Sequence, residues 1–89
     1  MNTNQTTQVR SAEEIQNWLI AQMADRLQLD ADEIDIDEPF DSYELDSAQA
    51  MGMLGKLEGW LGYEFNPVVI FNYPTVSELS ARLAEEIRA

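Results

Sequence analysis

Residues 46–62, with the sequence DSAQAMGMLGKLEGWLG, decide the fold because they carry the start, the buried face and the end of one amphipathic helix. Asp46 is a favourable N-cap residue, and Gln49 lies three positions later, where a capping-box partner is found. Apolar residues recur every three or four positions and form one buried face: Ala50, Met53, Leu54, Leu57 and Leu61. Gly62 is a typical C-cap residue. The stretch predicts a helix that opens at Asp46-Ser47 and is closed by Gly62.

Three glycines lie inside this predicted helix, namely Gly52, Gly55 and Gly59. Each costs about 1 kcal/mol relative to alanine in a helix interior. Two interpretations are open. Either the glycines permit the close approach of a partner, or the helix is poorly optimised.

Capping boxes of the form S/T-x-x-E open two further helices, at residues 11–14 and 75–78, and the first of these helices is expected to end near Gln28. Their apolar faces are Ile15, Trp18, Leu19, Met23 and Leu27 in the first, and Val76, Leu79, Leu83 and Ile87 in the last. Residues 68–73 are apolar and would also suit a strand, but no second strand candidate exists to pair with them. We therefore expect a short helix there, closed by Pro74. The prediction is an all-α fold, a small four-helix bundle with three main helices and one short one.

The first two helices are joined by an acidic stretch, residues 30–46, in which nine of seventeen residues are acidic and none is basic. Pro39 forbids a continuous helix here. Apolar residues are spread through the stretch: Ile34, Ile36, Phe40, Tyr43 and Leu45. We expect a long ordered loop that these residues pin to the core, and loops of this length in a compact domain are usually functional.

The whole chain has 89 residues, enough for one small domain, and its formal net charge is −12 from seventeen acidic and five basic residues. Phosphate contacts need a basic surface, so this charge argues against binding nucleic acid, and it disfavours anionic lipid for the same reason. A strongly acidic small domain is steered toward basic patches on protein partners. The alternative is that the charge serves solubility alone.

The sequence contains no cysteine and no histidine. The usual nucleophile machinery and the commonest metal ligand are therefore missing, and we expect neither an enzyme nor a metal site. No apolar run is long enough to span a membrane, and residues 1–10 lack the apolar stretch of a signal peptide. We expect a cytoplasmic protein in which residues 1–10 form a disordered N-terminal tail.

Ser47 lies at the end of the long loop and at the start of the predicted helix, so we expect its hydroxyl to be exposed. A phosphodiester attached there would lie at the positive end of the helix dipole, which stabilises an anion by about 0.3–1 kcal/mol, and beside free backbone N–H groups. The alternative is that Ser47 only helps to cap the helix, since capping serines are common.

Three segments around and after Ser47 carry a resemblance to a known family. Leu45-Asp46-Ser47 resembles the Asp-Ser motif at which acyl carrier proteins receive phosphopantetheine. Leu57-Glu58, followed by Gly62, is similar to the "LE…G" that ends the second helix in this family. Residues 71–75, FNYPT, are similar to the "FDYPT" run of carrier domains from polyketide and nonribosomal peptide synthases.

Upstream, residues 29–35 and Pro39-Phe40 are similar to the family's first loop, so the resemblance extends over residues 11–88. It implies a carrier domain of the acyl carrier type over residues 11–89. Two positions depart from the family pattern: Glu44 replaces a glycine three residues before the serine, and Ala48 replaces a leucine or methionine just after it. Because partner enzymes of the family dock at that following position, the small Ala48 implies a restricted set of partners.

The resemblance also implies a function. A phosphopantetheinyl transferase would attach 4'-phosphopantetheine covalently to Ser47, and the arm would hold acyl groups as thioesters for polyketide, lipopeptide or fatty-acid-derived biosynthesis. A fatty acyl-AMP ligase is the expected loading enzyme, and ketosynthase or other synthase domains are the expected clients. The residues implied in docking these partners are Asp41, Glu44, Asp46, Ala48, Met51 and Glu58.

Two alternatives remain open. A peptidyl carrier would hold aminoacyl groups on the same arm, and an acidic adaptor module would bind a basic protein with no arm at all. The start at Met1 predicts a free-standing carrier, with an excised domain as the alternative. We expect the carrier to be a monomer.

Overall fold

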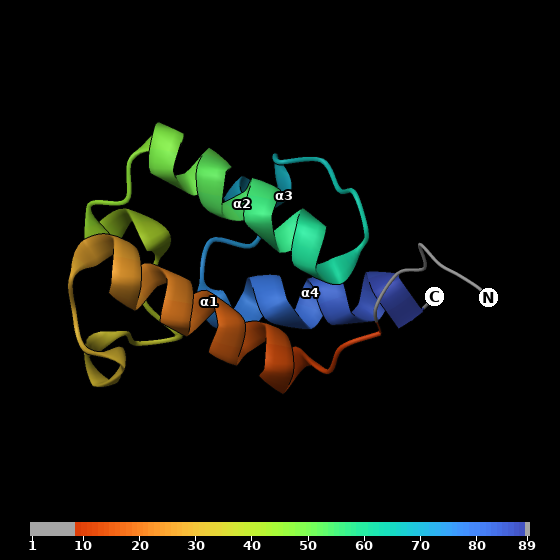
Figure 1. Ribbon diagram of the computed structural model, residues 1–89, viewed down its shortest axis with the longest axis horizontal. Coiled ribbons are helices and arrows are strands. Elements are labelled where there is room, and N and C mark those ends of the chain that lie inside the picture. The colour runs from red at the N-terminus through yellow and green to blue at the C-terminus, as the bar shows by residue number, and fades with distance from the viewer. Residues whose placement is uncertain (1–8, 89) are drawn as a thin grey trace.

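The computed structural model describes residues 9–88, in which four α-helices pack as a small bundle. Their bounds are α1 Ala12–Leu27, α2 Ser47–Leu61, α3 Val69–Asn72 and α4 Val76–Arg88. Helix α1 lies beside α4 and runs in the opposite direction to α2 and α4 (Figure 1). The one-turn α3 lies between α2 and α4 in the chain. The described residues form no strand, only one isolated bridge between Pro39 and Thr75. The predicted all-α bundle is therefore confirmed.

Each main helix begins at a residue that the sequence indicates. Ser11 and Glu14 form the predicted capping box, since the Glu14 amide donates to Ser11 Oγ at 3.1 Å and the Ser11 amide donates to Glu14 Oε1 at 2.9 Å. Before α2, the Gln49 amide donates to Asp46 Oδ1 at 2.8 Å. The fourth helix is capped by a side chain in the same way, because the Glu78 amide donates to Thr75 Oγ1 at 3.1 Å.

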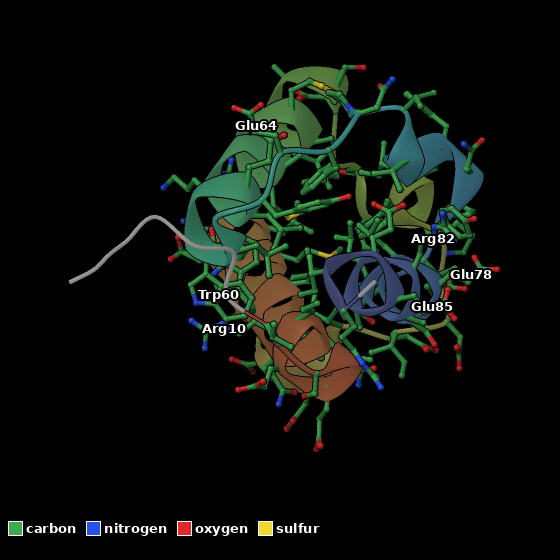
Figure 2. The ribbon with its side chains drawn as sticks, turned by 90° about the vertical axis from the view of Figure 1, so that its right-hand side faces the viewer. Arg10, Trp60, Glu64, Glu78, Arg82 and Glu85 are labelled. Atoms are coloured by element: carbon green, nitrogen blue, oxygen red, sulfur yellow. The ribbon has the colours of Figure 1, made fainter. Side chains whose placement is uncertain are left out.

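The core lies where the inner faces of α1, α2 and α4 meet. Fully buried side chains come from the three predicted faces: Ile15, Leu19, Met23, Met53, Leu57, Leu61, Val76, Leu79 and Leu83. Trp18 and Leu27 are only half-buried, and the Trp18 ring stacks on Trp60 with centroids 5.4 Å apart. The guanidinium group of Arg10 lies over the ring of Trp60, 4.3 Å from its centroid, and Figure 2 shows the two residues close together. Of the predicted tail, residues 1–8 lie outside the described residues.

The predicted long loop contains two 3₁₀ helices, which the sequence patterns did not reveal: η1 Ala31–Glu33 and η2 Phe40–Tyr43. Its apolar residues anchor it as predicted, with Ile34, Phe40 and Leu45 buried. Backbone hydrogen bonds also join the loop to the end of α3 and the start of α4. Phe40 donates to the Pro74 carbonyl at 2.9 Å, and Ser77 donates to the Ile36 carbonyl at 2.9 Å. The loop that leads into Ser47 is thus fixed to the bundle.

Across residues 9–88, none of the helices has both the length and the apolar character needed to cross a bilayer.

Candidate functional site

Ser47 is the first residue of α2 and is exposed at the point where the acidic loop meets the bundle. The cap of α2 is provided by Asp46, whose carboxylate accepts the Gln49 amide. Within residues 9–88 the Ser47 hydroxyl has no hydrogen-bond partner. The capping interpretation of Ser47 therefore loses its support, because the neighbouring residue does that work and leaves the serine hydroxyl available.

An apolar cavity of about 160 Å³ opens beside Ser47. Its walls come from η2, the turn before α2, α2, α3 and the segment after α3: Phe40, Asp41, Leu45, Ala50, Met51, Ile70, Phe71 and Pro74. Phe71 is 71% exposed and Met51 is 39% exposed, so the apolar wall continues onto the surface. Sequence patterns did not reveal Phe71 as a site residue. The only signal was its place in the FNYPT run, which says nothing of its exposure.

The structure gathers most of the expected docking residues near Ser47, but not all of them. Asp41 lines the cavity, and Glu44, Asp46 and Ala48 are exposed on either side of the serine. Glu58 lies at the other end of α2. It is half-buried, and its Oε2 accepts a hydrogen bond from the Phe65 amide at 2.9 Å. That carboxylate thus fixes the connection after α2.

The glycines of α2 fall into two groups. A methyl group built on Gly52 would lie 3.6 Å from both terminal nitrogens of Arg26, in ordinary contact, so a side chain of α1 lies near this exposed glycine. Gly55 and Gly59 have no atom within 4 Å of a methyl group at the same place. No packing within residues 9–88 therefore requires these two glycines, and both interpretations of them stay open.

Glu44 has a left-handed backbone conformation, with φ 58° and ψ 28°. Residues with a Cβ rarely adopt this conformation, which glycine adopts without steric strain. The expected family glycine at this position now has a physical reason, and the replacement by glutamate leaves strain three residues before Ser47.

This site suits a covalent phosphopantetheine group. The Ser47 hydroxyl is exposed and unpartnered, and a phosphodiester on it would lie at the N-terminus of a 15-residue helix. The apolar cavity next to the hydroxyl offers a contact surface for the carbon chain of such an arm.

Comparison with known proteins also points to phosphopantetheine attachment. Residues 17–83 match the family described as "Phosphopantetheine attachment site". One phenolphthiocerol/phthiocerol polyketide synthase protein from Mycobacterium tuberculosis is 35% identical over 81 residues, which are 91% of this chain and 4% of that protein. The acyl carrier protein TtuC from Teredinibacter turnerae is 38% identical over 52 residues, which are 58% of this chain and 60% of that protein. The chain therefore spans only a small fraction of its synthase relative.

Two solved structures resemble this one closely. An acyl carrier protein from Anabaena sp. PCC 7120, described as having a variant phosphopantetheinylation-site sequence, is 50% identical with a TM-score of 0.83; the match covers 97% of this chain and 99% of that one. A free-standing peptidyl carrier protein from Acinetobacter baumannii is 28% identical with a TM-score of 0.81, over 86% of this chain and 96% of that one.

The matched family is defined by the attachment of phosphopantetheine, a covalent prosthetic group, and the proteins that this chain resembles are polyketide synthases, acyl carrier proteins and a peptidyl carrier protein. This chain belongs to that family and is a carrier domain of the acyl carrier protein type.

Proposed function

We propose that Ser47 is the attachment residue and that this chain carries acyl groups. The observation that supports this most directly is the free Ser47 hydroxyl at the start of α2, beside an apolar cavity and inside the matched region 17–83. When bound, phosphopantetheine supplies a terminal thiol that holds an acyl group as a thioester.

The residues of the chain present this hydroxyl and hold the arm near the bundle. Asp46 fixes the first turn of α2 through the Gln49 amide, so the serine has a defined position. The helix dipole favours the negative phosphodiester on Ser47. Met51 and Phe71 offer apolar surface at the mouth of the cavity, next to the attachment point.

Carrier domains are modified by a phosphopantetheinyl transferase and work with synthase domains. The docking surface proposed for these partners here consists of Asp41, Glu44, Asp46, Ala48 and Met51, all of them exposed. Glu58 is left out of it, because it is half-buried at the other end of α2, away from Ser47. Basic patches on a partner would be attracted to the three carboxylates, with Met51 as the apolar contact.

The cargo proposed is an acyl group from polyketide, lipopeptide or fatty-acid-derived biosynthesis, loaded by a fatty acyl-AMP ligase and passed to a ketosynthase or another synthase domain in the cytoplasm. The polyketide synthase relatives and the apolar walls of the cavity favour this cargo. The similarity to a peptidyl carrier protein favours a second candidate, an aminoacyl cargo on the same arm.

Intact-mass measurement after incubation with coenzyme A and a broad-range transferase tests the carrier function. We expect the mass to rise by one phosphopantetheine, and an unchanged mass would support the unmodified adaptor instead. The modified protein is then offered a fatty acyl-AMP ligase with a fatty acid, or an adenylation domain with an amino acid. Loading of the fatty acid alone supports the acyl cargo, whereas loading of the amino acid alone contradicts it.

A further inference from the structure

The side chain of Tyr43 closes the loop that leads to Ser47. Its phenol oxygen accepts a hydrogen bond from the Asp35 amide at 2.6 Å, and its hydroxyl donates to the Asp35 carbonyl at 3.2 Å. One side chain thus binds both backbone polar groups of a residue eight positions earlier. This pair of bonds, here called the Tyr43 clamp, joins η2 to the first part of the acidic loop.

The clamp lies directly before the strained turn. Glu44 follows Tyr43 and holds the left-handed conformation, with φ 58°. Leu45, the next residue, is buried with 8% of its surface exposed, and Asp46 then caps α2. Glu44 is therefore held between two anchors, the clamp on one side and the buried Leu45 on the other. A non-glycine residue keeps a sparsely populated conformation only where its surroundings impose it.

We propose that Tyr43 is a positioning residue for arm attachment: its clamp on Asp35 holds the left-handed turn at Glu44, and this turn sets where α2 begins and how Ser47 is presented to the transferase. The proposal rests on the proposed function of Ser47. It also accounts for a glutamate where a glycine would suit the backbone better, because the clamp supplies the restraint that the strained residue needs.

Amide hydrogen exchange of Tyr43→Phe tests the structural half of the proposal without any arm. The Asp35 amide loses its acceptor and should exchange faster in any case. The decisive amides are those of Gln49 and Ala50. The Gln49 amide donates to Asp46 Oδ1 at 2.8 Å, and the Ala50 amide donates to the Asp46 carbonyl at 2.8 Å. We expect their exchange to rise roughly 2- to 10-fold, the range set by the loss of one hydrogen bond. Faster exchange at Asp35 alone would overturn the proposal.

Glu44→Gly provides the rescue. Glycine adopts the left-handed turn without strain, so the turn should need the clamp less. In the double variant, Gln49 and Ala50 should return toward the exchange of the wild type while Asp35 stays unprotected. If Tyr43→Phe speeds the exchange of the Gln49 and Ala50 amides equally with Glu44 and with glycine at position 44, the clamp and the turn are not linked as proposed.

Transferase kinetics test the functional half. Tyr43→Phe should raise the KM of the transferase for the carrier and leave kcat unchanged, because only the presentation of Ser47 changes. Glu44→Gly also removes one docking carboxylate, so it serves as its own reference: in that background, Tyr43→Phe should raise the KM less than it does with Glu44 present. The matched control is Tyr63→Phe, which removes a phenol hydrogen bond to Glu86 beyond the other end of α2 and should leave the KM unchanged. A KM that Tyr63→Phe raises as much as Tyr43→Phe does would reject the positioning role, whereas a wild-type protein that takes up no arm would reject the proposed function itself.

Discussion

The two ends of α2 use the same backbone conformation for different purposes. Beyond its C-terminus, Gly62 has φ 66°, and before its N-terminus, Glu44 has φ 58°. The glycine adopts this conformation without strain and closes the helix, whereas the glutamate adopts it under strain at the turn before the exposed Ser47. The C-terminal end is built for stability and the N-terminal end for presentation. Gln28, the C-cap of α1, has the same conformation with φ 60°, so the backbone angle alone does not mark a site; Glu44 differs in its place just before Ser47.

The side chains around the two ends of α2 also differ in how many interactions they make. Near the C-terminal end, Trp60 stacks on Trp18, and the Tyr63 hydroxyl donates to Glu86 Oε1 at 2.9 Å. Arg82 Nε binds the other oxygen of Glu86 at 2.9 Å. The hydrogen bond to Glu86, followed by burial and the charge of Glu86, raises the pKa of Tyr63 above its usual 10.0. A hollow of about 200 Å³ lies there too, lined by Phe65, Arg82 and Glu86 among others. At the N-terminal end the cavity borders Ser47, whose hydroxyl has no partner within residues 9–88.

The largest expected difference between the two ends concerns the apolar side chains. Leu61 is fully buried next to Gly62, and Leu61→Ala should lower the free energy of unfolding by about 2–5 kcal/mol, as in other cores. Met51 is 39% exposed one turn after Ser47, and Met51→Ala should change it by no more than about 0.5 kcal/mol. Urea unfolding measures both values. Similar losses at the two positions would mean that the Ser47 end is packed as tightly as the core.

The left-handed residues should respond in opposite directions. Gly62→Ala introduces a Cβ at φ 66° and should destabilise the protein by about 1 kcal/mol. Glu44→Gly removes the strain, which stabilises the protein, but it also raises the chain entropy of the unfolded state, which opposes this gain. We expect a net stabilisation of about 0.5–1 kcal/mol. Thermal unfolding of both variants shows whether each substitution raises or lowers the stability. A destabilising Glu44→Gly would show that no strain is held at the Ser47 end.

Reversing a surface charge should give the smallest effect, a change in the rate of modification by the transferase. We expect it only near the N-terminal end of α2, where partners are proposed to dock. Asp41→Lys should slow modification by the transferase a few-fold at low salt, because rim charges act mainly on association. The effect should fade as the Debye length falls below about 8 Å, its value near 0.15 M salt. Glu64→Lys, an exposed reversal just after Gly62, is the matched control and should have little effect. A rate that does not depend on salt would instead point to apolar contacts through Met51.

The helices and their starts could be predicted because their signals are local. A capping box such as that of Ser11 and Glu14 lies within four residues, and the buried faces repeat with the helical period. Gly62 is the same kind of signal, since a glycine just after an apolar face favours a left-handed cap. The two 3₁₀ helices were missed because they are too short to show a period. Short local bonds set them, such as that from the Asp30 amide to Glu33 Oε1 at 2.9 Å.

The site could be predicted only in part, because its remaining features depend on tertiary contacts. The Asp-Ser motif and the helix start identify Ser47 as the candidate. Nothing near Glu58 in the sequence shows that its carboxylate reaches the Phe65 amide seven residues later. The cavity, the exposure of Phe71 and the backbone of Glu44 arise when η2, α2 and α3 are brought together. A residue pattern alone does not contain that information.

The central claim is that the free hydroxyl at the start of α2 is the attachment point, and intact-mass measurement of two serine variants tests it most directly. Ser42 is the nearest competing serine and lies in η2, within the acidic loop. After incubation with coenzyme A and a broad-range transferase, Ser42→Ala should gain one phosphopantetheine like the wild type, and Ser47→Ala should gain none. Full modification of Ser47→Ala would contradict the account.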